Sequence, residues 1–463
     1  MNHTDSYNNK GFNVQQLINK LTDISHSENI SKWDIGASFS EDISVQVDHG
    51  ESKQLKGSQR NAITIRAWNN KGLVGTTSTT DLTDAGLIKA LKGAKEASQF
   101  GNKNEIPDFS PLANSPIVQL NRPIGKRNTI KDLLELLKKA ESDLLNSHEA
   151  ISSVPYNGLS ESYLERIYLN SAGAYRHINS TQSSIYLYAK CQEKGRKPRS
   201  SGSIRLSHSL DKLDITGCVN ESSSKTLSHL NYSSIDTGKY LVCFTPEAFL
   251  DMIYAFGSIF NARSVIDGVS LSNRNSIGET IAYKNLSIYD NPLHQANIGA
   301  SPFDGEGTPT SKICIVNNGI LESFIHSEYT ARQFGVKPTG HAGMGSKVSV
   351  GLDWLEISKC NQLNDELNYQ HLNHNTYKDK FILIESLNAI HAGVKASQGS
   401  FSLPFDGWII KDGEKVSIEA ATVAGDIKYL LNNIIHIEST SKITHQGISP
   451  YVWVDNLSIT GEV

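Results

Sequence analysis

The sequence predicts an α+β protein, in which helices cover an antiparallel sheet in the amino-terminal half and antiparallel β-structure dominates the carboxy-terminal half. Three observations support this prediction. Apolar residues recur at helical spacing over 129–147, with charges opposite, as is typical of a helix packed on a sheet. Alternating apolar runs at 43–47 and 62–68 indicate strands. Asn318–Gly319 and Asp412–Gly413 each separate two apolar runs, and both pairs favour the two-residue turn of a β-hairpin.

Further elements of the amino-terminal half follow from the same rules. Apolar spacing predicts a first amphipathic helix over 13–27, and Thr83 is placed to cap a second helix. Residues 69–72 are expected to form a turn between strands. Residues 162–170 and 184–191 are expected to be strands, because β-branched and aromatic residues are frequent in both.

The carboxy-terminal half contains two short helix signals. A buried strand at 240–245 is expected to lead into a helix that starts at Pro246, because proline is tolerated in the first turn. A second helix is expected from Ser327 to Gly335, since glycine suits the left-handed conformation that ends a helix. Residues 420–433 are expected to form a turn and a short helix.

The length of 463 residues is enough for roughly two or three domains. We expect an amino-terminal α+β domain over 1–235 and a mainly β domain over 236–463. A further boundary is expected near 107–123, where prolines cluster. The basic stretch 194–203 and the serine run at 222–224 are expected to be exposed loops.

Composition and charge argue against several classes of protein. The net charge of −4, with a single short basic run, does not suit a nucleic-acid surface. The 5 cysteines are widely spaced and form no CxxC pair, which suits reduced thiols. The amino-terminal residues lack the apolar core of a signal peptide, and no apolar run reaches the ~20 residues needed to span a bilayer. We therefore expect a cytoplasmic protein.

The loop 301–309 contains two carboxylates, Asp304 and Glu306, between glycines and prolines. Two neighbouring carboxylates could act as a general acid and a general base. The flanking residues favour the alternative, in which both side chains fix turn geometry and shape a substrate site. A second glycine-rich loop follows at 340–345.

Five strings in a fixed order carry a family resemblance. They are SPFDGEG from Ser301, the NG hairpin, YTAR from Tyr329, TGHAG from Thr339, and GVKASQGSFSLPFDGWIIKDGEKV followed by ATVAGDI. In this order the chain resembles the TldD/PmbA family, once called modulators of DNA gyrase. Each string alone is a turn pattern, so the order carries the resemblance, which runs from about Asp34 to the carboxy terminus.

In the metal-bearing branch of this family, the helix after the short strand carries HExxxH, whose histidines bind zinc and whose glutamate activates water. The corresponding helix here reads PEAFLDMIYAFGSIFNA, and no histidine lies between His229 and His294. Apolar side chains offer no lone pairs to a divalent cation. The active branch also uses a cysteine near its carboxy terminus, where this chain reads KITHQGIS, with His445 but no cysteine.

Two other histidine patterns could suggest a metal site. His148 and Glu149 begin like a zinc motif, but serines occupy the positions of the second ligand, so a loop is favoured. His371 and His374 lie three residues apart in a polar, asparagine-rich stretch. A zinc site needs a third ligand, so a solvated loop is favoured there.

The resemblance and the missing motif together imply a TldE/PmbA-type subunit. Such a subunit lacks zinc and pairs with a TldD-type metallopeptidase that cleaves peptides and unstructured proteins, including precursors of modified peptides. This chain then needs no cofactor, zinc is expected in the partner, and no residue here is expected to be catalytic. Candidates to face the peptide, which strand edges would bind through backbone hydrogen bonds, are Asp304, Glu306, Arg332, Thr339 and His341.

Two alternatives stay open. The first is an autonomous peptidase of the same family with a rebuilt site, using His341, His391 or His445 with a carboxylate. The second is a regulatory binding protein, as the gyrase name suggests, which would need a nucleic-acid or topoisomerase surface. Whether the isolated chain forms a homodimer is also open.

Overall fold

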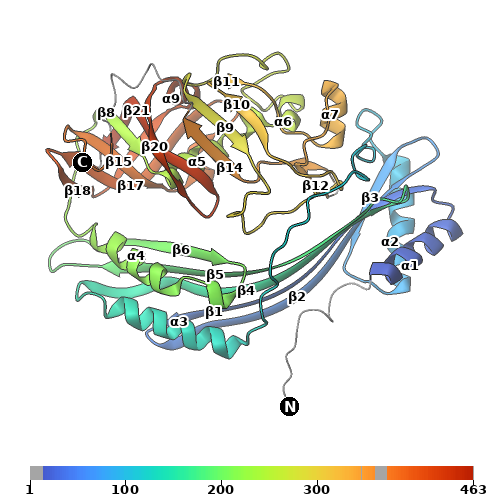
Figure 1. Cartoon of the computed structure of the whole chain (residues 1–463), viewed down its shortest axis with the longest axis horizontal. Helices are drawn as coiled ribbons and strands as arrows, with labels where there is room; N and C mark the ends of the chain where they lie inside the picture. The colour runs from blue at the N-terminus through green and yellow to red at the C-terminus, as the bar shows by residue number, and fades with distance from the viewer. Residues whose placement is uncertain (1–13, 346, 360–372, 462–463) are drawn as a thin grey trace. The chain divides into compact units, whose positions relative to one another are not determined.

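The computed structural model describes residues 14–345, 347–359 and 373–461. They form two compact units, and each is described by itself. Unit 1 contains the chain up to Leu227 together with Ser301–Thr310 and Ser327–Ser349, and unit 2 contains Ser228–Ala300, Ser311–His326 and the chain from Val350 onwards. The single boundary expected at 235/236 differs from this division, in which the segments Ser301–Thr310 and Ser327–Ser349 belong to the first unit. The predicted α+β class is confirmed, with an antiparallel sheet and helices in unit 1 and a β-rich unit 2 (Figure 1).

Unit 1 is built on a six-stranded antiparallel sheet with the strand order β3-β2-β1-β4-β5-β6. The strands are β1 Lys32–Asp48, β2 Glu51–Trp68, β3 Val74–Thr79, β4 Ile151–Asn170, β5 Tyr175–Cys191 and β6 Arg199–Ser207. They are longer than the apolar runs predicted. The half of β2 that starts at Glu51 is exposed on both faces and is held by pairing with β1. Its sequence therefore shows no alternation of apolar and polar residues.

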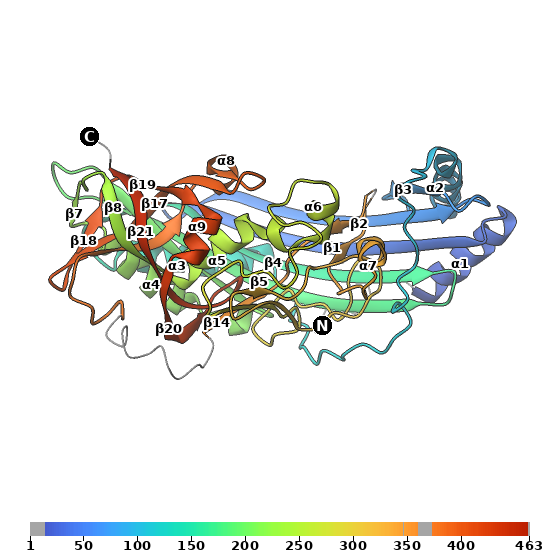
Figure 2. The same ribbon diagram turned by 90° about the horizontal axis from the view of Figure 1, so that it is seen from above.

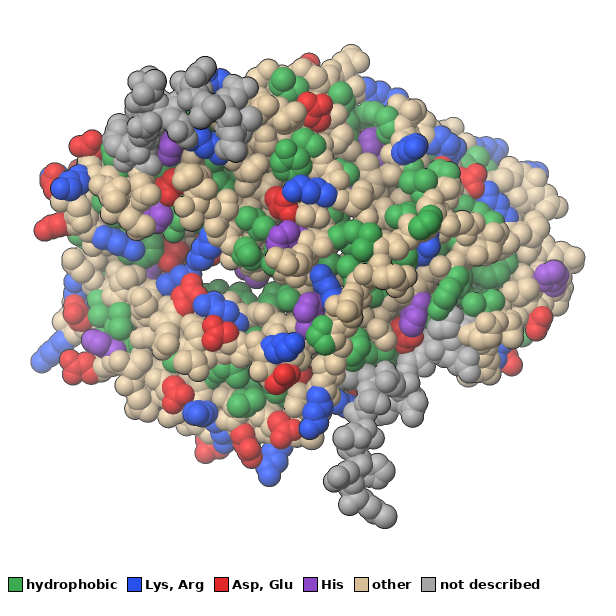
Figure 3. All heavy atoms as spheres, viewed as in Figure 1, with side chains coloured by type: hydrophobic (Ala, Val, Ile, Leu, Met, Phe, Trp, Pro, Cys, Tyr) green, Lys and Arg blue, Asp and Glu red, His purple; other side chains and the backbone are tan. Residues whose placement is uncertain are grey.

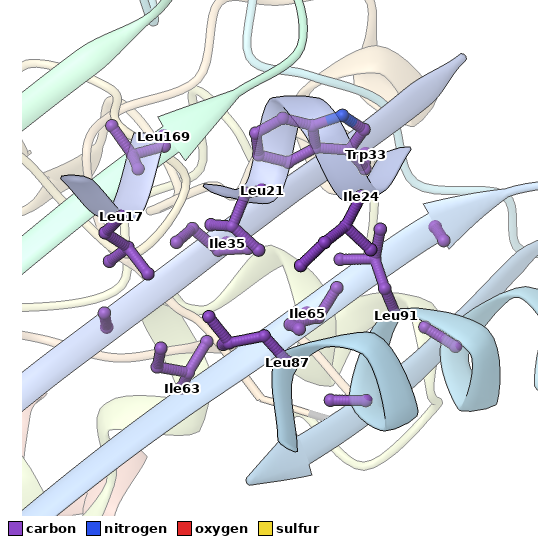
Figure 4. Packing of buried hydrophobic residues seen from close by; sticks show 14 of the residues in the cluster. Leu17, Leu21, Ile24, Trp33, Ile35, Ile63, Ile65, Leu87, Leu91 and Leu169 are labelled. Carbon is purple, nitrogen blue, oxygen red and sulfur yellow. The ribbon is translucent and has the colours of Figure 1, made fainter. Parts of the chain in front are cut away.

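Four helices pack on one face of this sheet, whose long strands run side by side in Figure 2. They are α1 Val14–Ser27, α2 Asp84–Ala97, α3 Ile130–Leu145 and α4 Ile215–Leu227. Helices α1 and α2 pack on sheet residues around Ile35, and Figure 4 shows Leu21 and Leu87 directed at Ile35 and Ile63. Helices α3 and α4 pack on a second cluster around Leu187. The first three helices and the capping role of Thr83 confirm the predictions.

Two loop predictions in unit 1 were wrong. Strand β6 begins at Arg199, within the stretch expected to be an exposed loop. Ser222 and Ser223 lie on a buried side of α4, where the Ser222 hydroxyl donates to the Leu187 carbonyl at 2.9 Å. A serine hydroxyl can be buried when a backbone carbonyl accepts its hydrogen bond, so a serine run alone does not indicate exposure.

Unit 2 contains a 13-stranded sheet with the main path β11-β10-β9-β14-β21-β8-β15-β17-β18-β7. Its strands are β7 Tyr232–Ser233, β8 Gly238–Phe244, β9 Leu286–Asp290, β10 Ile313–Asn317, β11 Ile320–Leu321, β14 Leu355–Lys359, β15 Phe381–Leu387, β16 Val394–Lys395, β17 Ser400–Lys411, β18 Glu414–Ile418, β19 Ala421–Asp426, β20 Ile434–Ile443 and β21 Gly447–Gly461. Its helices are α5 Pro246–Ala255, α6 Ala262–Ile266, α8 Ile390–Gly393 and α9 Ile427–Asn432.

The turns of unit 2 follow the predicted chemistry. Asn318 and Gly319 have φ of 51° and 78° and join β10 to β11, while Asp412 and Gly413 have φ of 53° and 81° and join β17 to β18. Both hairpins are therefore confirmed. The prediction for 420–433 was correct only in its second half, because β19 precedes α9.

Three further short elements are α7 Glu328–Phe334, β12 Ala342–Gly343 and β13 Ser349–Val350. Within the described ranges, no helix is both long enough and apolar enough to cross a membrane.

Candidate functional site

The carboxylate of Asp304 organises the acidic loop from within. Its Oδ1 accepts hydrogen bonds from the backbone nitrogens of Glu306 at 2.8 Å and Thr308 at 3.0 Å. Its Oδ2 accepts from the backbone nitrogen of Ala342 at 3.0 Å. One side chain thus closes its own turn and fastens the second glycine-rich loop to the first.

Glu306 joins this loop to the sheet and to helix α7. Its Oε1 accepts from Arg66 Nη1 at 3.2 Å, and its Oε2 accepts from the backbone nitrogen of Glu328 at 2.8 Å. The second contact places a carboxylate on an amide nitrogen of the first helical turn, where a negative charge is stabilised. Glu306 is 0% exposed, so this carboxylate lies wholly inside unit 1.

Arg66 is the cation of the buried network. It donates from Nε to Asp34 Oδ1 at 2.9 Å and from Nη2 to Asp34 Oδ2 at 2.5 Å, and the Tyr168 hydroxyl donates to the same Asp34 Oδ2 at 3.2 Å. The register of β1 and β2 sets Asp34 directly opposite Arg66. We refer to Asp34, Arg66, Tyr168 and Glu306 as the buried network.

Burial controls the electrostatics of these groups. Burial and the nearby Asp304 together raise the pKa of Glu306 to about 7, against the opposing effect of Arg66. Burial also raises the pKa of Asp304, although three backbone N–H groups favour its charged form. Burial alone would lower the pKa of Arg66, but the attraction of Asp34 and Glu306 outweighs burial and raises it. The guanidinium therefore stays charged, and burial favours the protonated form of Glu306 more than in an exposed carboxylate.

Two glycines of the loop allow this close packing. A Cβ on Gly305 would lie 2.3 Å from the backbone nitrogen of Met344, and a Cβ on Gly307 would lie 2.5 Å from the ring of Tyr168. Gly307 also has a φ of 74°, a conformation that L residues rarely adopt. The loop therefore requires glycine at both positions.

Arg332 extends from α7, the helix that Glu306 holds. Ser327 caps this helix and Gly335 ends it with φ 68°, as predicted. Arg332 donates from Nε to Glu328 Oε1 at 2.8 Å and from Nη2 to the carbonyl of Ile106 at 2.5 Å. Its side chain is still 49% exposed, so a ligand can reach it.

Thr339 and His341 lie on the second loop. The Oγ1 of Thr339 is 2.9 Å from His341 Nδ1. His341 is buried and acts electrostatically on Asp304, whose pKa it lowers, whereas Thr339 is half-buried. All five predicted site residues thus belong to unit 1, with Asp304 and Glu306 inside it and Arg332 at its surface.

Sequence reasoning missed Asp34, Arg66, Tyr168 and Glu328. A usable signal was present, because an arginine in the apolar run 62–68 needs a buried partner. A hairpin centred on His49 and Gly50 brings Asp34 close to Arg66. A bulge near Gln46 shifts the register by one residue, so that the two residues lie directly opposite each other. The partner could therefore have been found by pairing the two strands.

Helix α5 in unit 2 contains the apolar segment singled out in the sequence. It follows β8, Thr245 caps it, and Pro246 occupies its first turn, as predicted. Its side chains Phe249, Met252 and Ile253 are buried. The described part of the chain contains no group of three or more His, Cys, Asp or Glu that could hold a metal ion.

The sequence suggested several other histidines as metal ligands or catalytic groups. His148 is exposed in a turn, where its Nδ1 accepts from the backbone nitrogen of Ala150. His374 is not solvated as predicted, because its Nδ1 lies 2.9 Å from Glu438 Oε2 and its ring stacks on Tyr451. His371 lies outside the described residues. His391 and His445 are exposed.

Unit 1 also contains a cavity of about 710 Å³ beside α1 and the β4–β5 turn. Its lining includes Trp33, Leu169 and Tyr175, and no Asp, Glu, Lys or Arg. None of the predicted site residues lines it.

Comparison with known proteins connects this architecture to a defined class. Residues 126–230 match the model of the PmbA/TldA metallopeptidase central domain, and residues 237–461 match that of the PmbA/TldA metallopeptidase C-terminal domain. Metalloprotease PmbA of Escherichia coli O157:H7 is 23% identical over 415 residues, covering 87% of this chain and 86% of that protein. A metalloprotease of Methanothermobacter thermautotrophicus is 24% identical over 325 residues, covering 67% of each chain.

Solved structures share the fold. A candidate modulator of a DNA gyrase from Thermotoga maritima superposes with a TM-score of 0.84 at 23% identity, covering 96% of this chain and 100% of that one. TldE from Thermococcus kodakarensis superposes with a TM-score of 0.81 at 19% identity, covering 97% and 100%. The fold and the two matched domains define the class as a metallopeptidase architecture. The chain belongs to the PmbA/TldD family.

Proposed function

We propose that this chain is the subunit without a zinc site in a two-subunit peptidase, and that it pairs with a TldD-type subunit that holds the zinc. The observation that carries this proposal is helix α5. In the metal-bearing branch the equivalent helix supplies two histidines and a glutamate, whereas α5 directs Phe249, Met252 and Ile253 into the interior of unit 2. A zinc ion needs nitrogen, oxygen or sulfur ligands.

The polar side chains of α5 do not replace the motif. Glu247 forms an ion pair with Lys442 at 3.1 Å, and Asp251 accepts from Gln446 Nε2 at 2.8 Å. Burial raises the pKa of Asp251, which disfavours the charged form that a metal ligand needs. Both carboxylates are therefore committed to local structure.

The contribution of this chain to the complex is architectural. The buried network fixes the acidic loop and α7, so that Arg332 is presented at the surface on a rigid support. Arg332 and Thr339 are the proposed contacts of an extended peptide or unstructured protein, while Asp304, Glu306 and the buried His341 position them from inside. A guanidinium can bind a peptide carbonyl or carboxylate.

The complex is proposed to work in the cytoplasm. Cys191, Cys218, Cys243 and Cys314 are free thiols. Reduced, unpaired cysteines suit that compartment.

The proposal is tested by purifying this chain alone, the TldD-type subunit alone and the two together. Zinc would be measured by mass spectrometry and cleavage by an unstructured fluorogenic peptide. We expect no stoichiometric zinc and no cleavage from this chain, and both from the complex. The matched control is a complex whose TldD-type subunit carries Gln in place of the HExxxH glutamate, which should assemble without cleaving.

A different result would favour the autonomous peptidase. Chelator-sensitive cleavage by this chain alone, lost in His341→Ala, would show a rebuilt site and contradict the proposal. A salt-dependent shift of DNA mobility by the chain would instead favour the regulatory reading.

A further inference from the structure

The cavity of about 710 Å³ in unit 1 lies between one side of α1 and the end of the sheet where β4 turns into β5. The apolar side of α1 packs into the core around Ile35. A second side of the helix faces the cavity through residues spaced by about one helical turn, namely Ile18, Thr22, Ser25 and His26. The volume falls within the usual range of small-ligand sites.

The sheet side of the cavity is held by hydrogen bonds of its own. The Oδ1 of Asn170 accepts from the backbone nitrogens of Ala172 at 3.0 Å and Ala174 at 2.9 Å, which fixes the β4–β5 turn. The backbone nitrogen of Ser171 donates to the Trp33 carbonyl at 2.9 Å, and the backbone nitrogen of Trp33 donates to Ser171 Oγ at 3.1 Å. This wall is therefore preformed.

The indole of Trp33 supplies a hydrogen-bond donor to the cavity. Trp33 is only 5% exposed and lines the cavity, and in Figure 4 its ring nitrogen is on the side of the ring away from Ile35. Its indole N–H donates to no group in the described part of the chain. A buried indole N–H usually has an acceptor, so a ligand with an acceptor would complete this site.

The lining carries no fixed charge. It contains no Asp, Glu, Lys or Arg, and its ionisable side chains are His26 and Tyr175. Burial and the nearby Glu165 raise the pKa of Tyr175, so the phenol stays uncharged at neutral pH. On the face shown in Figure 3, hydrophobic side chains gather over the α1 end of unit 1. A charged ligand would lose hydration here without gaining an opposite charge, so the cavity favours an uncharged one.

The length of the cavity distinguishes among uncharged ligands. Ile18 and His26 lie about 12 Å apart along the axis of α1, at about 1.5 Å per residue. An extended peptide segment of about four residues spans the same distance, at about 3.3 Å per residue. A single sugar also offers acceptors, but it covers only part of this length.

We propose that this cavity binds a short extended segment of a peptide whose side chains carry no charge. A backbone carbonyl of the segment accepts from the Trp33 indole. The carboxamides of Asn29 and Asn70, which also line the cavity, can each donate and accept, as a peptide group does. Ile18 and Leu169 offer contact to an apolar side chain of the segment.

This inference rests on the proposed function for the source of the peptide, and it adds a contact site separate from Arg332 and Thr339. Neither of those residues lines the cavity. A segment held in the cavity makes the same contacts before and during cleavage, so the site is expected to lower KM and to leave kcat unchanged. Substrates with uncharged stretches would then be preferred.

Indole resonances of the isolated full chain test the site directly. Labelling with ¹⁵N-indole gives one signal for each of the 5 tryptophans, and Trp33→Phe identifies the signal of Trp33. The probe is a hexapeptide of glycine, serine and leucine with acetyl and amide ends. We expect the probe to shift the Trp33 signal saturably and to leave the other tryptophan signals in place.

Matched variants and probes define the specificity. Thr22→Tyr places a ring in the cavity from a half-buried position of α1 and should raise the Kd of the probe at least tenfold. Asn19→Tyr, at an exposed position of the same helix, should leave the Kd within twofold and the circular dichroism spectrum unchanged. A central lysine or glutamate in the probe should weaken binding at least tenfold, and trehalose should not shift the Trp33 signal.

Several results would overturn the inference. They are a Trp33 signal that the probe does not shift, equal binding of the charged probes, a shift caused by trehalose in place of the peptide, and an unchanged Kd in Thr22→Tyr. The measurement uses this chain without a TldD-type subunit. A failure of the zinc prediction would therefore leave probe binding intact, and a loss of probe binding would leave the zinc content of the complex unaffected.

Discussion

Arg66 and Asp34 face each other across β1 and β2 and share two hydrogen bonds, of 2.9 Å and 2.5 Å, with both side chains almost fully buried. A bidentate pair of this kind is specific in geometry, and its two charges are costly to separate. Because Arg66 also bonds Glu306, the sheet of unit 1 determines where the acidic loop and α7 lie.

Replacing Arg66 should therefore be strongly destabilising. Arg66→Met leaves two buried carboxylates without their cation, and we expect a loss of about 3–5 kcal/mol in the free energy of unfolding. Urea denaturation followed by tryptophan fluorescence would measure it. Arg60→Met is the matched control, because Arg60 is on the same strand with a 73% exposed side chain, and its loss should stay below about 1 kcal/mol. Equal losses for the two variants would contradict the structural role of Arg66.

Glu306 should make stability depend on pH near neutrality. Its pKa of about 7 in the folded chain lies above the ordinary value of roughly 4.3 in an unfolded chain. Between these values the folded state binds more protons, so this group stabilises the protein fully below the lower value, and that stability is lost as the pH rises through 7. Glu306→Gln cannot lose a proton and should flatten the slope between pH 5 and 7.

Urea denaturation at several pH values would measure this slope. Between pH 5 and 7 the free energy of unfolding should fall by up to about 3 kcal/mol through this group. Glu149→Gln is the control, since Glu149 is exposed in a turn and the native slope should persist. A slope that is unchanged in Glu306→Gln would contradict the assignment.

Alanine variants of Gly307 and Gly335 would distinguish the cost of backbone strain from the cost of overpacking. Gly307 and Gly335 have φ of 74° and 68°, but only a Cβ on Gly307 would meet the Tyr168 ring. Gly335→Ala should cost about 1–2 kcal/mol, through conformation alone. Gly307→Ala should cost an additional 1–3 kcal/mol, roughly, through overpacking. Thermal unfolding of both variants would measure the difference, and equal costs would show that the loop does not press on the sheet.

Most elements of the fold could be predicted from local chemistry. The NG and DG turns, the Thr83 cap and the Gly335 stop all depend on residues close in sequence, and the structure confirms each of them. The polar half of β2 could not be predicted, because its strand conformation depends on pairing with β1 and not on burial.

The site was predictable only in part. The loop that contains Asp304 and Glu306 stands out in the sequence through its glycines and prolines. Its cation, Arg66, lies 240 positions from Glu306 in the chain, and no local pattern connects the two. Glu306 is buried against that distant residue, which is why a carboxylate expected to face a substrate lies inside unit 1.

Arg332 should affect the binding of peptide more than its cleavage. In the complex with a TldD-type subunit, we expect Arg332→Ala to raise the KM for an unstructured peptide about tenfold, equivalent to roughly 1.4 kcal/mol, with kcat nearly unchanged. Steady-state kinetics on the purified complex would measure both constants. Lys337→Ala, an exposed cation in the same segment, is the control and should leave KM within about twofold. A fall in kcat without a rise in KM would contradict the proposal that Arg332 contacts the peptide in the enzyme–substrate complex.

We propose that the apolar helix α5 leaves this chain dependent on its partner for zinc. The most direct measurement is the zinc content of the chain purified alone from its native source and of the complex from the same source. We predict less than about 0.1 zinc per isolated chain and about one per complex, held by the TldD-type subunit. One tightly bound zinc in the isolated chain, resistant to dialysis, would contradict the account.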